Sequence, residues 1–493
     1  MSRSVLSCLI CLTACRSAAP PVPARAPGDE PLFTAAQLSE DFFLLRRVFE
    51  ELHPGLYRYN TRASLDASFQ TLLGAVEHGA TLPAAYRALS VFLATVKCGH
   101  TYANFFNQPK AIADRLFRGG ATRVPFWFVW RGGKMVVTRD FTAGALLAPG
   151  TEVLAIDGVP APAILKALLA VARADGSNDA KRTNALEIHG DTDLEAFDIY
   201  FPLFFPQRAA GRYLLSRGGG PDLSVEALTF AQRLAPVEAA LAARRGGDGP
   251  SWTLTFEGPA AWLTMPTWAL YQSRWDWKEF LQQSFAELRR RGVRELVIDL
   301  RGNEGGLAVD DALLAQLIRT PLRREQFERR VRYRKVPDTL LPVLDTWDPS
   351  FKDWGADAVG PVDGFYRLIR ADDEGGVILP GAQPFAGRVW VVVDAANSSA
   401  TFEFAQVVQR ERLGTLIGSA TGGNQRGING GAFFFVRLPR TGLEADLPLI
   451  GQFPPGAPPD AGLTPDVPVE TTPADLAAGR DPVRVKLALL WAK

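Results

Sequence analysis

One stretch of the chain, from Val389 to Ala405, constrains the fold more than any other. It opens with five apolar residues, Val389–Val393, a pattern typical of a β-strand that is buried on both faces. Residues 394–397 are turn formers, and Ala400–Gln409 contains no glycine or proline, which predicts a helix. We therefore expect an α/β layer in which a buried strand leads through a tight turn into a helix.

Two serines, Ser398 and Ser399, occupy the turn between that strand and that helix. A serine in this position can present its hydroxyl at the end of a sheet, beside the free N–H groups of the first helical turn. Such N–H groups bind anions, which an acyl-transfer reaction needs next to its nucleophile. The simpler interpretation is that both serines only cap the helix, and this stretch alone favours the cap.

Length and composition allow two or three domains, each with its own core, in a chain of 493 residues that is 47% hydrophobic. The formal net charge is +1, from 54 basic and 53 acidic residues, and the sequence has no basic run. Nucleic acid is therefore not an expected partner. No apolar stretch is long enough to span a bilayer.

The N-terminus has the pattern of a targeting segment, and we expect residues 1–14 to be a signal peptide. Leu12–Cys15 (LTAC) resembles the lipobox of bacterial lipoproteins, in which the cysteine becomes the lipidated first residue of the mature chain. An ordinary secretory signal that is cleaved nearby is the alternative. Residues 15–32, with lipidated Cys15 at their start, are expected to be a Pro-rich disordered tether. The pattern predicts a lipoprotein of the bacterial cell envelope, facing the periplasm or the cell exterior and membrane-anchored by its lipid.

Cysteine usage limits the chemistry of the mature chain. Cys98 is the one cysteine outside the leader, so it has no partner for an intrachain disulfide, and a zinc site built on cysteines is excluded. The sequence implies no metal and no organic cofactor.

An N-terminal helical region is expected over residues 33–110. Apolar residues recur at helical spacing within Thr34–His53, whose first residue opens a capping-box pattern. Two further amphipathic segments, 63–77 and 82–96, follow it. Lys97–Thr101 is a loop-like break after the last of them.

Short strands are expected next, over residues 123–175. Val124–Trp130 and Lys134–Arg139 flank two glycines, which indicates a hairpin. Pro149–Gly158 resembles the segment of PDZ-like domains that reads G-D-x-I-L-x-I-N/D-G. That resemblance implies a β-rich module that binds extended peptides at a sheet edge, and a small domain that only packs is an equal alternative. Residues 176–250 are expected to be a connecting region.

Residues 251–493 are expected to form an α/β domain, because helical and strand patterns alternate along them. Glu295–Leu300 is a buried strand that leads directly into the glycine cluster of Arg301–Gly306. Glycines there let backbone N–H groups face a ligand at the C-terminal end of a parallel sheet. Later strands of this domain are expected at 416–418 and 432–438.

Six segments, in order along the chain, resemble the carboxyl-terminal processing and tricorn-type serine peptidases. They are His53–Tyr57, Cys98–Thr101, Leu296–Gly306 ("LIIDLRGNGGG" in the family), Asn397–Ala400 (the nucleophile turn), Gly418–Gly423 and Gly462–Val467. The resemblance implies an α/β fold with a crotonase-like core, a PDZ-like module and an N-terminal helical region. It also implies hydrolysis of peptide bonds through an acyl-enzyme on Ser399.

Members of this family differ in the residue that acts as the general base. Processing peptidases pair the serine with a lysine in T-x-G-K-G, but Thr421–Gln425 has no lysine there, and Arg426 cannot lose its proton. The tricorn-like branch uses a histidine, and His100 stands in the matching D-G-H-T place, although Cys98 replaces the acid. A histidine titrates near neutral pH and can relay the serine proton. A loop histidine with a purely structural hydrogen bond is the alternative.

The remaining site residues follow from the same resemblance. Asp460 stands near the place of a family glutamate and is the expected group that orients His100. The oxyanion hole is expected to consist of the N–H groups of Gly305 and Ala400, with Gly306 nearly equivalent to Gly305.

The leading hypothesis is a serine endopeptidase that acts on a peptide or protein substrate. A non-catalytic binding protein on the same fold is the alternative, because the family includes interphotoreceptor retinoid-binding protein, which carries apolar ligands. A third possibility is an inactive peptide-binding scaffold. The aromatic segments Tyr200–Phe205 and Phe433–Phe435 fit an apolar cavity, although core packing is the commoner role. The sequence leaves the cleavage preference and the oligomeric state open.

Overall fold

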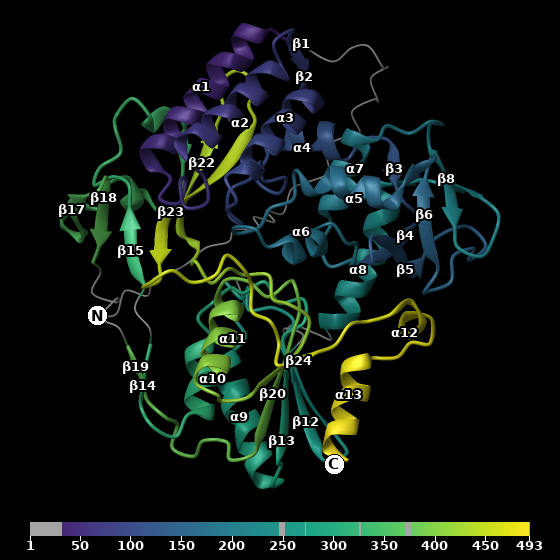
Figure 1. The fold of residues 1–493 in the computed structure, drawn as a ribbon, viewed down its shortest axis with the longest axis vertical. Helices are drawn as coiled ribbons and strands as arrows, with labels where there is room; N and C mark the ends of the chain where they lie inside the picture. The colour runs from purple at the N-terminus through teal and green to yellow at the C-terminus, as the bar shows by residue number, and fades with distance from the viewer. Residues whose placement is uncertain (1–31, 246–251, 272, 325–326, 370–375, 493) are drawn as a thin grey trace.

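The computed structural model describes residues 32–245, 252–271, 273–324, 327–369 and 376–492. The expected signal peptide, Cys15 and nearly all of the tether lie outside the described residues. Within these ranges, no helix is both long and apolar enough to cross a membrane. The fold is mixed α/β, and its described residues form three six-stranded sheets with helices packed against them (Figure 1).

A mostly parallel sheet forms the lower half of the molecule in Figure 1. In order across the sheet, its strands are β11 (Thr253–Glu257), β12 (Ala260–Thr264), β13 (Glu295–Asp299), β20 (Arg388–Val393), β21 (Thr415–Gly418) and β24 (Val467–Pro468). All neighbours run parallel except β11, which is antiparallel to β12. Its helices are α9 (Trp277–Arg290), α10 (Asp310–Leu317), α11 (Ala400–Arg410) and α13 (Pro482–Trp491). The predicted strand–turn–helix around Ser399 is β20 followed by α11.

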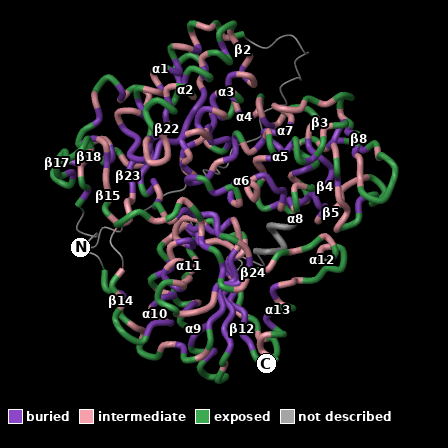
Figure 2. Tube along the Cα trace, in the orientation of Figure 1, coloured by how far each residue is buried: buried purple, intermediate pink, exposed green. Residues whose placement is uncertain are grey.

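Strand β20 is buried on both faces, as its apolar run predicts. Val389, Val391 and Val393 belong to a core cluster shared with α9, α10 and α11. Trp390 and Val392, which point the other way, belong to a second cluster shared with α13. The strands around β12 are correspondingly buried in Figure 2. Helices on both faces leave the carboxyl edge of the sheet for function, and the loops after β13 and β20 meet there.

A second sheet lies between the parallel sheet and the N-terminal helices (Figure 1). Its strands, in order, are β16 (Leu344–Asp345), β22 (Asn429–Arg437), β23 (Glu444–Phe453), β15 (Glu328–Val331), β18 (Phe365–Leu368) and β17 (Ala358–Val362). The N-terminal helices are α1 (Ala35–Leu52), α2 (Arg62–Gly74), α3 (Leu82–Thr95) and α4 (Lys110–Phe117). They share one apolar core with this sheet, in which Phe42 and Leu45 are clustered with Phe434.

The strand expected at 432–438 is therefore present as β22, but it belongs to the second sheet. Its fully buried Phe434 packs in the N-terminal core rather than on the parallel sheet. Residues 251–493 thus contribute to two cores, and the second sheet joins the N-terminal helices to this part of the chain.

The third sheet contains the expected hairpin. Its strands, in order, are β4 (Phe126–Arg131), β5 (Lys134–Asp140), β6 (Glu152–Ile156), β8 (Arg212–Arg217) and β9 (Leu223–Glu226), with β7 (Val159–Pro160) paired to β6. Its helices are α5 (Ala161–Leu169), α6 (Asp179–Ala185), α7 (Ala196–Phe204) and α8 (Phe230–Arg245). The region 176–250 thus supplies two strands of the sheet that begins in 123–175.

Short elements complete the fold: β1 (Leu32–Phe33), β2 (Ala80–Thr81), β3 (Ala121–Arg123), β10 (Leu228–Thr229), β14 (Leu322–Arg323), β19 (Val377–Ile378) and α12 (Pro473–Ala477).

Candidate active site

Ser399 stands at the turn from β20 into α11 in a backbone conformation that is unusual for a residue with a side chain. Its φ is 54° and its ψ is −133°. Such a conformation costs free energy and is typical of a nucleophile held on a sharp strand-to-helix turn. The side chain of Ser399 makes no capping hydrogen bond to α11. Ser398 Oγ instead donates to the backbone carbonyl of Glu304, 3.3 Å away, so neither serine acts as a simple helix cap.

The buried amide of Asn397 fixes this turn to the loop that follows β13. Its Nδ2 donates to the carbonyls of Leu300 and Asn303, at 2.6 and 3.1 Å, and its Oδ1 accepts from the N–H of Asp394 at 2.8 Å. Thr401 Oγ1 also donates to the Asn303 carbonyl, at 2.9 Å. Two loops that are about a hundred residues apart in sequence are thereby locked together. The sequence alone did not identify Asn397 as the residue that joins them.

Gly305 packs directly on the nucleophile turn. A Cβ at this position would lie 2.9 Å from Ser399 Cβ and 3.0 Å from Ala400 N, so only glycine fits. Ala400 is the first residue of α11, and its N–H therefore has no acceptor within the helix. The N–H of Gly305, in contrast, donates to Asn303 Oδ1 at 2.9 Å. Gly306 is pressed against the backbone of Trp268, whose carbonyl oxygen would lie 2.2 Å from a Cβ there.

His100 comes from the N-terminal region, and its ring lies 5.7 Å from that of Phe433 on β22. Its Nδ1 is buried and, within the described residues, has no hydrogen-bond partner. Within the described residues, no hydrogen bond joins His100 to Ser399. Burial lowers the pKa of His100, and nearby Arg173 acts in the same direction, while Asp175 acts to raise it. The imidazole is therefore neutral at neutral pH.

His53 holds the loop that carries His100. The N–H of Gly55 donates to His53 Nδ1 at 3.0 Å, and His53 Nε2 is 2.8 Å from Thr101 Oγ1. Since Nδ1 accepts, Nε2 carries the proton and donates to the threonine. Burial lowers the pKa of His53 to about 3, so this ring stays neutral. His53 is thus a structural residue beside the site, and His78 lies on the surface next to Glu77.

An ion-pair triad links the two halves of the site. Lys181 Nζ lies 2.5 Å from Glu304 Oε1, and Arg173 lies 3.5 Å from Glu304 Oε2. Lys181 also donates to the Ala396 carbonyl at 2.9 Å, and Arg173 to the Gly99 carbonyl at 3.0 Å. Burial acts to raise the pKa of Glu304, but Lys181 and Arg173 overcome it and lower this pKa to about 2.

Two aspartates lie near the histidine loop, and they differ in their contacts. Asp175 Oδ1 accepts from the N–H of Gly99 at 3.0 Å and influences His100 electrostatically. Asp460 Oδ1 accepts from Asn424 Nδ2 at 2.7 Å and from the N–H of Ser177 at 2.9 Å. Within the described ranges, no hydrogen bond or ion pair joins Asp460 to His100. The same Asn424 amide also donates to the backbone carbonyl of Asp175, at 3.1 Å, so it bridges the two aspartates.

Comparison with known proteins identifies the α/β part of the chain. The sequence model of Peptidase family S41 matches residues 260–432, which include β12, β13 and the Ser399 turn. Residues 260–432 belong to peptidase family S41. A family of peptidases implies a peptide or protein substrate, and together with the serine turn it supports a serine peptidase. A comparison with curated proteins gave no match.

Solved structures share the fold of this chain over nearly its whole length. A structure of mature CPAF complexed with lactacystin is 15% identical, covers 92% of this chain and 97% of its own, and has a TM-score of 0.61. A crystal structure of mature CPAF is 16% identical, covers 90% of this chain and 94% of its own, and has a TM-score of 0.56. At these identities, the likeness establishes the mixed α/β fold.

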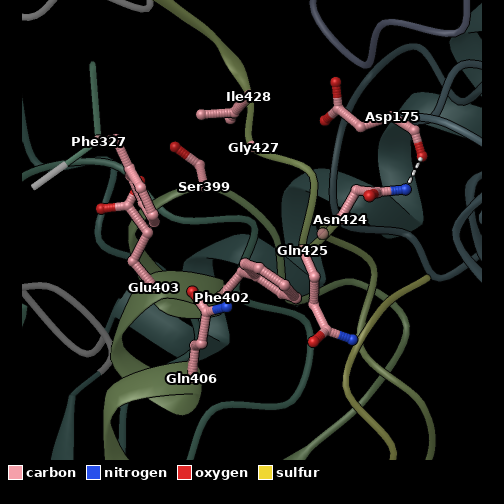
Figure 3. Close-up of a pocket in the computed structure, with 11 residues that line it drawn as sticks. Asp175, Phe327, Ser399, Phe402, Glu403, Gln406, Asn424, Gln425, Gly427 and Ile428 are labelled. Carbon is pink, nitrogen blue, oxygen red and sulfur yellow. Dashed lines mark hydrogen bonds between the residues drawn. The ribbon is translucent and has the colours of Figure 1, made fainter. Parts of the chain in front are cut away.

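An open cavity lies beside Ser399 (Figure 3). Its other lining residues are Asp175, Phe327, Phe402, Glu403, Gln406, Gly423, Asn424, Gln425, Gly427 and Ile428. The wall is therefore partly aromatic and partly polar. Among the described residues, no group of three or more His, Cys, Asp or Glu side chains is placed to hold a metal ion.

Besides Asn397, three further residues of the site were missed by sequence reasoning. Glu304 stands where the family segment has a glycine, and that departure was the available signal. Asp175 begins a stretch without periodic pattern, and only the loss of an acid at Cys98 hinted that another segment supplies one. Lys181 gave no signal, because a single lysine on a short helix is usually exposed.

Proposed function

We propose that this chain is a serine endopeptidase in which Ser399 forms an acyl-enzyme and His100 is the general base. The observation that carries the proposal is the strained, uncapped Ser399 at the mouth of a cavity, in a region that belongs to a peptidase family. A residue keeps such strain only where the surrounding hydrogen bonds impose it, and Asn397 supplies those bonds. A purely structural serine gives no reason for the conformation.

The reaction follows from the groups around the turn. Ser399 Oγ attacks the scissile carbonyl carbon while the neutral imidazole of His100 takes its proton. The developing oxyanion accepts hydrogen bonds from the N–H of Ala400 and from that of Gly305, which exchanges its bond to Asn303 for one to the substrate. The protonated imidazole then gives its proton to the leaving amine. A water molecule that is activated in the same way releases the acyl group.

Two aspartates, Asp175 and Asp460, are candidates for the carboxylate that assists His100. Asp460 is the candidate from the family pattern, and it reaches the histidine loop through Asn424. Asp175 is the candidate from geometry, because it binds the N–H of Gly99 and favours a protonated His100 electrostatically. Such a carboxylate stabilises the imidazolium that forms during the reaction. We propose Asp175 for this direct role and Asp460 for holding Asn424 in place.

The remaining parts of the proposal concern architecture and location. We propose that the parallel sheet with α9, α10 and α11 is a crotonase-like core, and that the sheet of β4–β9 with α5 is a PDZ-like module that presents an edge to peptides. We also propose a lipoprotein of the bacterial envelope that is anchored through Cys15. This last proposal rests on the LTAC pattern of residues 12–15.

A fluorophosphonate probe combined with a peptide-hydrolysis assay tests the catalytic proposal. Wild type should be labelled at Ser399 and should cleave peptides, whereas Ser399→Ala should lose both properties and keep its unfolding temperature. Ser398→Ala is the matched control, because it removes the neighbouring hydroxyl and leaves the turn intact. Equal hydrolysis by wild type and Ser399→Ala would overturn the nucleophile assignment. Tight binding of an apolar ligand without labelling would favour the binding-protein alternative.

A further inference from the structure

Glu403 shares the cavity with the proposed nucleophile. It lies on the first turn of α11, four residues after Ser399, and both residues line the cavity. Figure 3 shows its side chain beside the ring of Phe327, at the wall of the cavity. Gln406 follows on the same wall, three residues further along α11. A carboxylate is thus built into the cavity that a substrate side chain would enter.

The carboxylate of Glu403 has no partner of its own. Within the described part of the chain, it accepts no hydrogen bond and forms no ion pair. The charged groups that face it are Asp310 and Asp311 of α10 together with Arg324 and Arg329. Arg324 is held by Asp310 and by Asp311, whose Oδ1 is 2.6 Å away.

An incoming cation is therefore the group that this wall lacks. Within the described residues, both carboxylates of α10 hold Arg324, whereas the Glu403 carboxylate is held by no cation. Burial raises the pKa of Glu403 to about 7, with Asp310 acting in the same direction. A carboxylate that is buried without a partner costs free energy, and a cation beside it would remove that cost.

We propose that this cavity is a subsite for a positively charged group of the substrate next to the scissile bond, with Glu403 as the residue that selects it. The inference rests on the proposed peptidase function and names its substrate class. The side chains of lysine and arginine fit the wall, because their apolar stems can pack on Phe402 and Ile428 while the cation lies near Phe327 and Glu403.

A free N-terminal ammonium group of a peptide has the same chemistry and is a second source of the cation. It would make the enzyme cut near chain ends rather than within chains. Acetylation of the N-terminus removes that cation and leaves lysine and arginine side chains unchanged, so paired acetylated and free peptides distinguish the two sources.

The test is a peptide library read by mass spectrometry, cleaved by the full-length protein. Wild type should cleave next to lysine or arginine, or next to a free N-terminus, with kcat/KM about ten- to a hundredfold above that for neutral peptides, the size of a charge-assisted hydrogen bond. Glu403→Gln should lower that ratio toward one. Glu411→Gln at the end of the same helix, whose partner is the neighbouring Arg410, is the matched control and should keep the ratio.

A second variant keeps the test valid if Glu403→Gln folds poorly. Gln406→Lys places a fixed cation in the cavity, and the preference for cationic substrates should then disappear although Glu403 is intact. The wild-type preference should also grow as the pH rises through the pKa of Glu403, because the carboxylate becomes ionised.

The possible failures are distinguishable. Cleavage by wild type without a preference for cations, or a preference that survives in both variants, would overturn the inference and leave the peptidase assignment standing. A wild-type protein that neither cleaves any peptide nor takes the fluorophosphonate label would overturn the proposed function and the inference together.

Discussion

Glu304 is the residue at which a single change of charge should disturb both stability and catalysis. The change Glu304→Gln keeps the shape of the side chain, and it leaves in place the backbone carbonyl that accepts from Ser398. It removes the negative charge between Lys181 and Arg173. Lys181 is 5% exposed, so its ammonium group would be left with only the Ala396 carbonyl and a neutral amide. A buried cation without a counter-charge is costly.

The magnitude follows from the acidity of the carboxyl group. Burial raises the pKa of Glu304 and the two cations lower it, to about 2 from an ordinary 4.5. At 1.36 kcal/mol per pH unit, this difference corresponds to about 3 kcal/mol in favour of the folded state. The side chain is 51% exposed, and solvent screening reduces the contribution to about 1–2 kcal/mol. Because the folded pKa is depressed, this stability is present above about pH 4.5 and is lost as the pH falls toward 2.

Thermal unfolding and steady-state kinetics at pH 7 measure both effects. The unfolding temperature of Glu304→Gln should fall by about 2–5 °C. Its kcat should fall by about tenfold, because the loop of Ser399 and the loop of His100 lose their shared anchor. Glu287→Gln is the control: Glu287 also lies between two arginines and also has a pKa of about 2, set by hydrogen bonds from Arg290 and Arg291, but it lies on α9 and its partners are residues of the same segment. Identical unfolding temperatures and identical kcat values in wild type and both variants would refute the reasoning.

Three further predictions concern the nucleophile turn, the base and the anchor. Ser398→Ala should cost at most about 1 kcal/mol and keep most activity, because its hydroxyl makes only a 3.3 Å hydrogen bond; a loss as large as that of Ser399→Ala would contradict the assignment. The kcat/KM of wild type should fall on acidification through a pKa below 6.5, because burial lowers the pKa of His100 and a protonated imidazole cannot accept the serine proton; a profile that is flat down to pH 4 would exclude this base. Cys15→Ser should release the protein from membranes or leave its precursor uncut, and a wild type found wholly in the soluble fraction would exclude the lipid anchor.

The sequence predicted the elements whose signal is local. β20 and α11 were found to within one residue, because a strand buried on both faces needs an unbroken apolar run and a helix needs a stretch without breakers. The capping box at Thr34 was likewise readable, since both of its partners lie within four residues. The glycine cluster after β13 could be placed at the carboxyl edge because parallel strands bring their ends to one edge.

Pairings between distant segments could not be predicted from the sequence. β22 pairs with β23, which follows it, but their sheet is completed by β15, about a hundred residues earlier, and no local pattern specifies that partner. The contact between Asp175 and the loop of His100 depends in the same way on how the third sheet docks on the N-terminal helices. A motif can place a residue near a site, but the choice between Asp175 and Asp460 requires the docked structure.

The structure also determines which part of the proposed site is free to move. His100 is flanked by two anchored residues: Gly99 is bound through its carbonyl by Arg173 and through its N–H by Asp175, and Thr101 is bound by His53. The backbone on both sides of the imidazole is therefore fixed. Since no hydrogen bond joins His100 to Ser399 in the described residues, the proposed proton transfer requires the two groups to approach, and we propose rotation of their side chains as the movement. The unpartnered Nδ1 of His100 and the uncapped hydroxyl of Ser399 leave both groups without a competing hydrogen bond there that such a rotation would break. Catalytic hydrogen bonds that tighten only when substrate binds are common in enzymes.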